Sequence, residues 1–203
     1  MNLDTKNRKT RVSILALAIV FVSLAVHGQD RYNQSGTSTL SIAGTSTLHD
    51  WHMTSTEANY DAVFETNSTG DPVRLTSLVM SLPAESLKSE KAAMDKNAYN
   101  ALKTDVNKQI TFQLVSAKVV GKTIQCTGKL KIAGTTKQID LEATYTMLSG
   151  GALQCKGSKK IVMTDYGVEP PSFMFGSVTT GDEITVSFDV TLAPRKLQPV
   201  TLN

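Results

Sequence analysis

The chain has 203 residues, of which 21 are Lys or Arg and 18 are Asp or Glu. Four of these basic residues and one acidic residue lie within the first 28 residues, so the rest of the chain carries 17 charges of each sign. This neutral balance argues against nucleic acid as a partner, and the remaining length suits one domain with a sizeable core.

The first 28 residues have the order of features found in a signal peptide. A basic segment precedes an apolar run over residues 12–26, and Val26-His27-Gly28 places small residues where a signal peptidase reads. The run counts 15 residues. Because about 20 residues are needed to span a bilayer, we favour a cleaved signal over an uncleaved anchor. We expect the mature protein to begin at Gln29 and to be periplasmic or secreted.

Beyond the signal, the sequence predicts three parts. Residues 29–39 are polar and are expected to be a flexible lead-in, residues 40–193 form the folded domain, and residues 194–203 form a frayed tail. Within the domain, short runs alternate apolar and polar residues, as strands with one buried face do.

The first strands of the domain contain a change of phase. Leu40 and Ile42 share one face, whereas Trp51 and Met53 share a face of opposite parity. We therefore expect residues 44–47 to absorb a one-residue shift as a bulge or bend. The next two strands have inward faces made of Ala58, Tyr60, Ala62 and Phe64, and of Leu78, Met80 and Leu82.

Residues 89–103 break the two-residue period. Met94, Ala98 and Leu102 recur at every fourth position, no Gly or Pro intervenes, and Ser89 can cap the start. We predict one short amphipathic helix whose apolar stripe packs onto the sheet. A role for that stripe in gating a ligand is the less favoured alternative.

Strands resume after the helix and continue to the end of the domain. Their inward residues are Ile110, Phe112 and Leu114, then alternate positions of 124–132, then Ile139, Leu141, Ala143 and Tyr145, then Leu153, Cys155 and onward to Met163. A long connection over residues 166–181 leads to the last strand, 184–192, which has Ile184 and Phe188 on its apolar face. About eight strands and one helix indicate an all-β domain, either a sandwich or a closed barrel.

The two cysteines, Cys126 and Cys155, fall on inward faces two strands apart. Strands so placed are separated by about 9.5 Å, whereas a disulfide needs Cα atoms within about 7 Å. Barrel curvature can shorten this gap, so a disulfide is allowed. Free buried thiols are the favoured interpretation.

The sequence shows no sign of catalytic or metal chemistry. His49 and His52 are the only clustered ligand types, and residues three apart in a strand point to opposite faces. Motifs for nucleophilic, phosphate-binding or zinc-dependent catalysis are missing, and three histidines offer few candidates for acid–base work. We predict that the chain is not an enzyme and binds neither a metal nor a cofactor.

Several segments, taken in order, resemble the YceI-like family. Residues 78–112 resemble its strand–helix–I-T-F signature, which ends here at Ile110-Thr111-Phe112. Residues 126–137 contain Gly128-Lys129-Leu130-Lys131-Ile132, followed by a Gly and a Thr-Lys pair, and resemble the family's G-x-L-x-I-x-G-x-T-K hairpin. Asp165-Tyr166-Gly167 matches its D-[FY]-G segment, and residues 182–192 match its closing strand.

This resemblance covers residues 40–192 and implies a lipocalin-like, antiparallel eight-stranded barrel. It also implies export to the periplasm or beyond, and a long isoprenoid or similar amphiphilic chain bound in the lumen. The chain departs from the family form in its helix, where Glu90-Lys91-Ala92-Ala93-Met94-Asp95 replaces a more highly charged segment. Contacts made by those charges are not carried over.

We therefore expect a non-enzymatic binder of a polyisoprenoid or similar lipid-like molecule, which leaves room for transient contact with a membrane. The alternative is an extracellular interaction or structural module with a filled core. Trp51, Phe173 and Phe175 are expected near a barrel end, where they would either gate the lumen or plug it as ordinary core. The candidate lumen and mouth residues are Trp51, Tyr60, Phe64, Met80, Leu82, Phe112, Leu114, Leu130, Tyr145, Phe173, Phe175 and Phe188.

Overall fold

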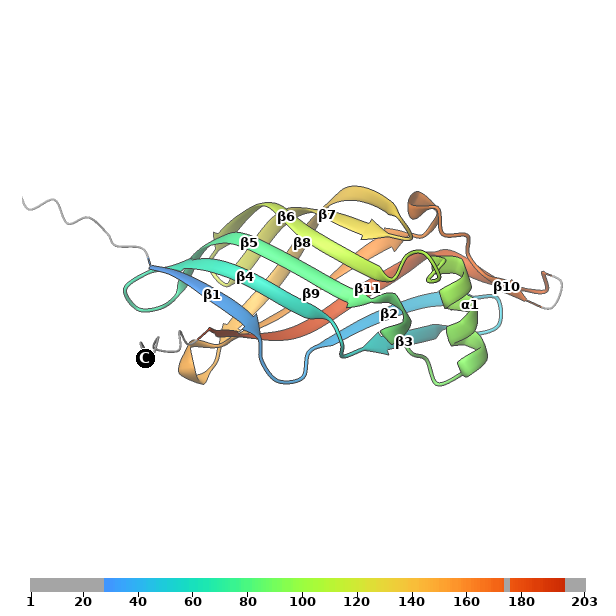
Figure 1. Cartoon of the computed structure of the whole chain (residues 1–203), viewed down its shortest axis with the longest axis horizontal. Helices are drawn as coiled ribbons and strands as arrows, with labels where there is room; N and C mark the ends of the chain where they lie inside the picture. The colour runs from blue at the N-terminus through green and yellow to red at the C-terminus, as the bar shows by residue number, and fades with distance from the viewer. Residues whose placement is uncertain (1–27, 174–175, 196–203) are drawn as a thin grey trace, which may run out of the picture.

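A computed structural model describes residues 28–173 and 176–195, which form an antiparallel β-barrel with one helix across one end (Figure 1). The strands are β1 (Gly28–Gln34), β2 (Thr39–Ser46), β3 (Trp51–Ser55), β4 (Asn59–Thr66), β5 (Pro72–Pro83), β6 (Gln109–Val120), β7 (Thr123–Ile132), β8 (Thr135–Met147), β9 (Leu153–Val162), β10 (Ser172–Phe173) and β11 (Val178–Pro194). The helix is α1 (Ala92–Leu102), and three single turns are η1 (Ala84–Ser86), η2 (Ser149–Gly151) and η3 (Thr164–Tyr166).

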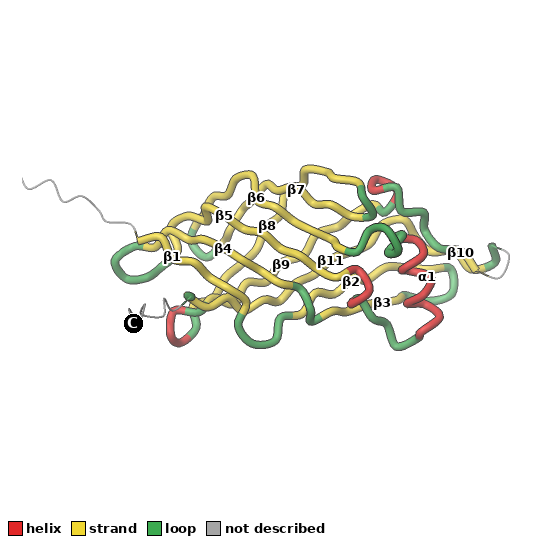
Figure 2. The backbone as a smooth tube through the Cα atoms, in the orientation of Figure 1, coloured by secondary structure: helices red, strands yellow, loops and turns green. Residues whose placement is uncertain are grey.

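These strand segments occupy eight places around the barrel. The long strand β11 pairs with β2 along most of its length and with β1 near its end, so β1 and β2 share one place. In the same way β4 pairs with β1 and β3 pairs with β2, so β3 and β4 share the next place. The strands β5 to β9 then lead back to β11 and complete the ring, which confirms the predicted fold class (Figure 2).

The expected flexible lead-in is a strand, so that prediction was wrong. Residues 28–34 form β1, which pairs with β4 from Gly28 to Asn33 and helps to close the barrel. Tyr32 is its one large apolar side chain facing inward, and it is only 2 % exposed. A single inward residue gives no alternation that could be recognised in the sequence. The pairing of β1 depends instead on strands that are distant in the sequence.

The phase change after Ile42 has a different cause from the one expected. Residues 47–50 form a hairpin turn between β2 and β3, and Gly44 lies directly opposite Trp51. The parity reverses because the hairpin pairs residues an odd number of positions apart, as in Gly44 with Trp51, and the β2–β3 ladder contains no register shift. The predicted connection over 166–181 is also shorter than expected, since β11 begins at Val178 and contains an irregularity between Thr180 and Ile184.

A second cluster of buried side chains lies toward the end of the barrel away from α1. There the rings of Tyr32 and Phe64 meet edge to face, with centroids 5.2 Å apart. Tyr145 is buried beside them in the same cluster and donates a hydrogen bond from its hydroxyl to the Gly121 carbonyl at 3.2 Å. This end is therefore sealed by side chains.

Both cysteines are free thiols on the inner face of the barrel. Burial raises the pKa of Cys126 to about 11 and that of Cys155 to about 12. At neutral pH both are therefore protonated and behave as small apolar side chains.

Candidate functional site

Two apolar cavities lie end to end inside the barrel. The larger one has a volume of about 410 Å³ and lies under α1, and the smaller one has a volume of about 120 Å³ and lies toward the sealed end. We call them the outer and the inner cavity. The side chains that border both are Leu40, Met80, Leu130, Ile161 and Val186. This ring forms a waist between the two spaces.

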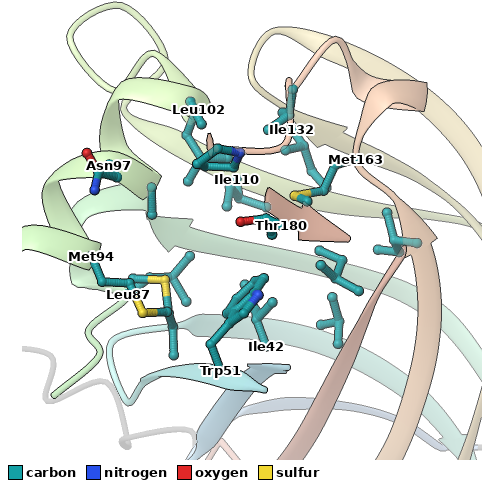
Figure 3. A pocket seen from close by; sticks show the side chains of 18 of the residues that line it. Ile42, Trp51, Leu87, Met94, Asn97, Leu102, Ile110, Ile132, Met163 and Thr180 are labelled. Atoms are coloured by element: carbon teal, nitrogen blue, oxygen red, sulfur yellow. The ribbon is translucent and has the colours of Figure 1, made fainter. Parts of the chain in front are cut away.

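The outer cavity is formed by the barrel wall and by α1. The wall contributes Trp51 from β3, Ile110 from β6 and Ile132 from β7, which Figure 3 shows together with Met163 around the open space. The helix contributes Met94, with Ala98 and Leu102 on the same stripe. The predicted amphipathic helix is thus confirmed, and its apolar stripe faces the cavity, which makes α1 a lid.

The lid is attached to the barrel by polar contacts at both of its ends. At the start, Asp95 Oδ1 accepts hydrogen bonds from the backbone N–H and the hydroxyl of Ser89, each at 2.7 Å. These bonds hold the pKa of the Asp95 carboxyl below its ordinary value. Near the other end, the Tyr99 hydroxyl contacts the carbonyls of Glu85 and Leu87 at 2.9 and 2.8 Å. The lid therefore stays attached to the 85–89 segment at neutral pH.

Polar side chains are confined to the mouth of the outer cavity. His49 comes from the β2–β3 hairpin, Asn97 comes from the lid, and Lys91 is the residue just before the lid, while Ser46 and Thr180 border the same rim. The exposed side chain of Leu48, 69 % accessible, lies beside them on the hairpin. An apolar interior with a polar rim is the arrangement that binds an apolar body and selects its polar end.

Three glycines let aromatic rings lie flat against the inner wall. Gly44 lies opposite Trp51, Gly157 lies opposite Phe188, and Gly128 lies next to the ring of Phe112. A Cβ added at any of the three would overlap that ring. Because these three positions have no side chain, the aromatic rings can lie against the wall and leave the centre of the lumen open.

Comparison with known proteins assigns the fold and the family. The family model described as YceI-like domain matches residues 34–192. The chain belongs to the YceI-like family. Comparison with functionally curated proteins found no match.

Solved structures of YceI-like and related proteins share the barrel at low sequence identity. BcnA from Burkholderia cenocepacia is 14 % identical with a TM-score of 0.63, over 76 % of this chain and 95 % of that one. A polyisoprenoid binding domain from Saccharophagus degradans is 12 % identical with a TM-score of 0.62, over 81 % and 98 %. A Campylobacter jejuni YceI protein is 16 % identical with a TM-score of 0.53, over 97 % and 94 %. These likenesses show the fold.

The YceI-like sequence segments now have places in this structure. Phe112 of the I-T-F segment lies on β6 and borders the inner cavity. Tyr166 of the Asp165-Tyr166-Gly167 segment ends η3 and borders the outer cavity. Gly167 follows with a φ of +68°, a left-handed conformation that glycine adopts without strain. The shared segments thus build the wall and a turn at the mouth.

Most of the predicted lumen residues border a cavity. Trp51 and Leu82 border the outer cavity, Tyr60, Phe64, Phe112 and Phe188 the inner one, and Met80 and Leu130 both. Leu114 and Tyr145 border neither, because Leu114 lies at a register shift of β6 and Tyr145 is packed into the sealed end. The side chains of Phe173 and Phe175 lie outside the described part of the chain, as do residues 1–27 of the signal segment.

The sequence interpretation missed the contribution of two segments to the outer cavity. One is the β2–β3 hairpin with Leu48 and His49, which was expected to be a bend. The other is the end of β9 and the turn after it, which bring Met163 and Tyr166 to the mouth. The D-[FY]-G likeness was the available signal for the second segment.

The described residues offer no arrangement suited to metal binding or to membrane insertion through a helix. Over residues 28–173 and 176–195, no group of three or more His, Cys, Asp or Glu side chains is placed to hold a metal ion. His49 contacts the carbonyl of Asp50 at 2.8 Å, and His52 lies on the exposed face of β3. No helix in this part of the chain is long and apolar enough to cross a bilayer.

The contact between Gly44 and Trp51 leads to a test of how the lumen is kept open. In Gly44→Ala the new Cβ would lie about 2.7 Å from Trp51 Cε2, so the indole must leave the wall. Its hydrogen bond from Nε1 to the Thr45 carbonyl, 3.0 Å long, is then lost. We expect the free energy of unfolding to fall by about 1–3 kcal/mol, the usual cost of overpacking, in a urea titration.

A double-mutant cycle isolates this contact. In a Trp51→Ala background the added methyl group finds space, and the same Gly44→Ala change should cost little. Equal costs in the two backgrounds would show that the strand itself, and not the indole, rejects the side chain.

Proposed function

We propose that this chain is an exported, non-enzymatic binding protein that holds a polyisoprenoid or similar lipid-like amphiphile in the barrel. The observation that carries the proposal is the pair of mainly apolar cavities aligned along the barrel axis, the larger of which has its polar side chains at its mouth. The Saccharophagus degradans relative is described as a polyisoprenoid binding domain, which agrees with this use of the fold.

The physical basis of such binding is transfer of a hydrocarbon chain out of water. Each buried CH₂ group contributes about 0.8 kcal/mol without demanding a fixed orientation. The outer cavity alone, at about 410 Å³, falls in the range of about 300–1,000 Å³ that small-molecule sites occupy. A flexible tail can extend past the waist at Met80 into the inner cavity. Affinity then depends mainly on tail length.

The alternative of an interaction module with a filled core has less support, because side chains fill only one end of this barrel. The proposal also assigns no catalytic role. Both thiols have a raised pKa and the polar groups of the mouth are spread along its rim. Groups spread in this way do not form the close acid–base arrangement that bond cleavage needs.

Export to the periplasm or beyond follows from the signal-like segment. The proposed cleavage before Gln29 would leave β1 almost complete, since this strand begins at Gly28. A lipid-like ligand would be taken up from a membrane or another carrier, which requires only transient membrane contact.

One preparation from the native host tests both parts of the proposal. Extraction of the purified protein with organic solvent, followed by mass spectrometry, should yield a molecule with a long apolar tail in near-stoichiometric amount. The intact mass of the same protein should correspond to a start at Gln29. An extract without any such molecule, together with no uptake of added prenyl alcohols, would reject the binding function, and a retained segment 1–28 would reject the export signal.

A further inference from the structure

The inner cavity has one charged residue on its wall. Inward positions of β9 alternate along the strand, so that Leu153, Cys155, Lys159 and Ile161 share the inner face. Lys159 borders the inner cavity, and the other residues that line this cavity are uncharged. A lysine at an inward position of β9 is unexpected, because the alternation along the strand predicts an apolar residue there.

Lys159 has no anionic partner within the part of the chain that the structure describes. Its neighbours on the outer face do: Lys156 pairs with Asp189 and Lys160 pairs with Glu183, each at 2.8 Å. No ion pair or side-chain hydrogen bond is formed by the Lys159 ammonium with residues 28–173 or 176–195. A cation beside an apolar tail without a counter-charge is unfavourable, so this position favours a ligand that brings an anion.

The place of Lys159 in the wall lets such an anion stay partly hydrated. Strand β9 pairs with β8 only as far as Gly157, which lies opposite Ala143. Lys159 is the next inward residue after the last pair, and Ile139 and Leu141 of β8 border the same cavity. The Lys159 side chain is half-buried, so its stem lies along apolar surface while part of it meets water. A head group here need not lose all its water.

We propose that Lys159 is the binding site for an anionic head group, a carboxylate or a phosphate monoester, on the amphiphile whose tail fills the barrel. The inference rests on the proposed function and adds the class and the position of the polar end. An ammonium on an anionic oxygen forms a charge-assisted hydrogen bond, about twice as strong as a neutral one. The head group would thus lie at the side of the barrel between β8 and β9, and the tail would extend through the waist toward the lid.

The competing position is the mouth, where Lys91 is also a cation and borders the outer cavity. Lys91 precedes the first residue of the lid and is exposed, so water screens its charge. A head group at the mouth would depend on Lys91, whereas a head group at the side would depend on Lys159. The two positions can therefore be separated by substitution.

The test uses three probes with one tail: geranylgeraniol, geranylgeranoic acid and geranylgeranyl monophosphate. Their dissociation constants are measured by calorimetry for the wild type and for Lys159→Met, Lys91→Met and Lys160→Met. Methionine keeps the length of the lysine stem and removes its charge, and Lys160→Met is the matched control on the outer face of the same strand. Unfolding midpoints establish that each variant is folded.

We expect the wild type to bind the acid or the phosphate about tenfold to a hundredfold more tightly than the alcohol. Lys159→Met should lose this preference and keep its affinity for the alcohol, whereas Lys160→Met should change neither. The dissociation constants of the acid and the phosphate, compared with each other, show which of the two anions the site binds more tightly. Loss of the preference in Lys91→Met with Lys159→Met unaffected would place the head group at the mouth and overturn the inference. Equal binding of all three probes by the wild type would overturn it too, yet leave the proposed function intact, whereas binding of none would reject the proposed function itself.

Discussion

Replacing Met80 by tryptophan is expected to weaken tail binding strongly while leaving the barrel folded. Met80 lies on β5 at the waist and borders both cavities. An indole at this position would occupy the space through which a tail passes from the outer to the inner cavity. If about four CH₂ groups are displaced at about 0.8 kcal/mol each, the dissociation constant for geranylgeraniol rises by about a hundredfold or more.

The neighbouring residue of the same strand supplies the control. Val79 points to the outside and is 47 % exposed, so Val79→Trp adds the same ring to the same strand without entering the lumen. It should bind geranylgeraniol as the wild type does. Calorimetric titration measures the affinity of both variants for geranylgeraniol, and thermal unfolding shows whether each variant is folded. Undiminished binding by a folded Met80→Trp protein would mean that the tail does not use the waist.

The all-β class could be predicted because several strands alternate apolar and polar residues, whereas the eight-stranded barrel was expected from the resemblance to the YceI-like family. On β8, for example, Tyr145 is buried and the odd positions before it are half-buried, as the alternation of apolar residues predicts. The helix could be predicted for a similar reason, since Met94, Ala98 and Leu102 keep a period that strands do not have. Features that depend on local periodicity are thus recoverable from one sequence.

Features that depend on distant partners were not recoverable. Strand β1 looks polar in isolation, yet its backbone pairs with β4 and β11, and its Asp30 accepts a hydrogen bond from Thr66 at 2.9 Å. Residues 44–47, at the start of the β2–β3 hairpin, were expected to form a bulge or bend, because a hairpin of this length changes the parity of the inward residues in the same way.

The candidate site shows the same division. The sequence pattern places Phe112 and Phe188 inside, but only the structure shows that each ring lies beside a glycine of a neighbouring strand. Whether a lumen is open or filled depends on such pairings across the barrel, and the spacing of residues along one strand does not report them. The open half under the lid and the sealed half around Tyr145 have similar strand patterns.

The sealed end leads to the largest expected effect on stability. Phe64 is 1 % exposed, is among the largest fully buried side chains, and packs edge to face on Tyr32, so that it joins β4 to β1 where the ring of strands closes. We expect Phe64→Ala to lower the free energy of unfolding by about 3–5 kcal/mol, the usual cost of removing a packed phenylalanine.

Phe188→Ala is the control for the expected cost of Phe64→Ala. Phe188 also borders the inner cavity, but it is half-buried and its ring lies on Gly157, so fewer contacts are lost and the cost should be clearly smaller. Urea unfolding of both variants measures the difference. Because the space left by Phe64 adjoins the inner cavity, Phe64→Ala should also bind a longer prenyl alcohol better relative to a shorter one than the wild type does. A loss below about 1 kcal/mol for Phe64→Ala would show that this end of the barrel is not packed and that the lumen continues through it.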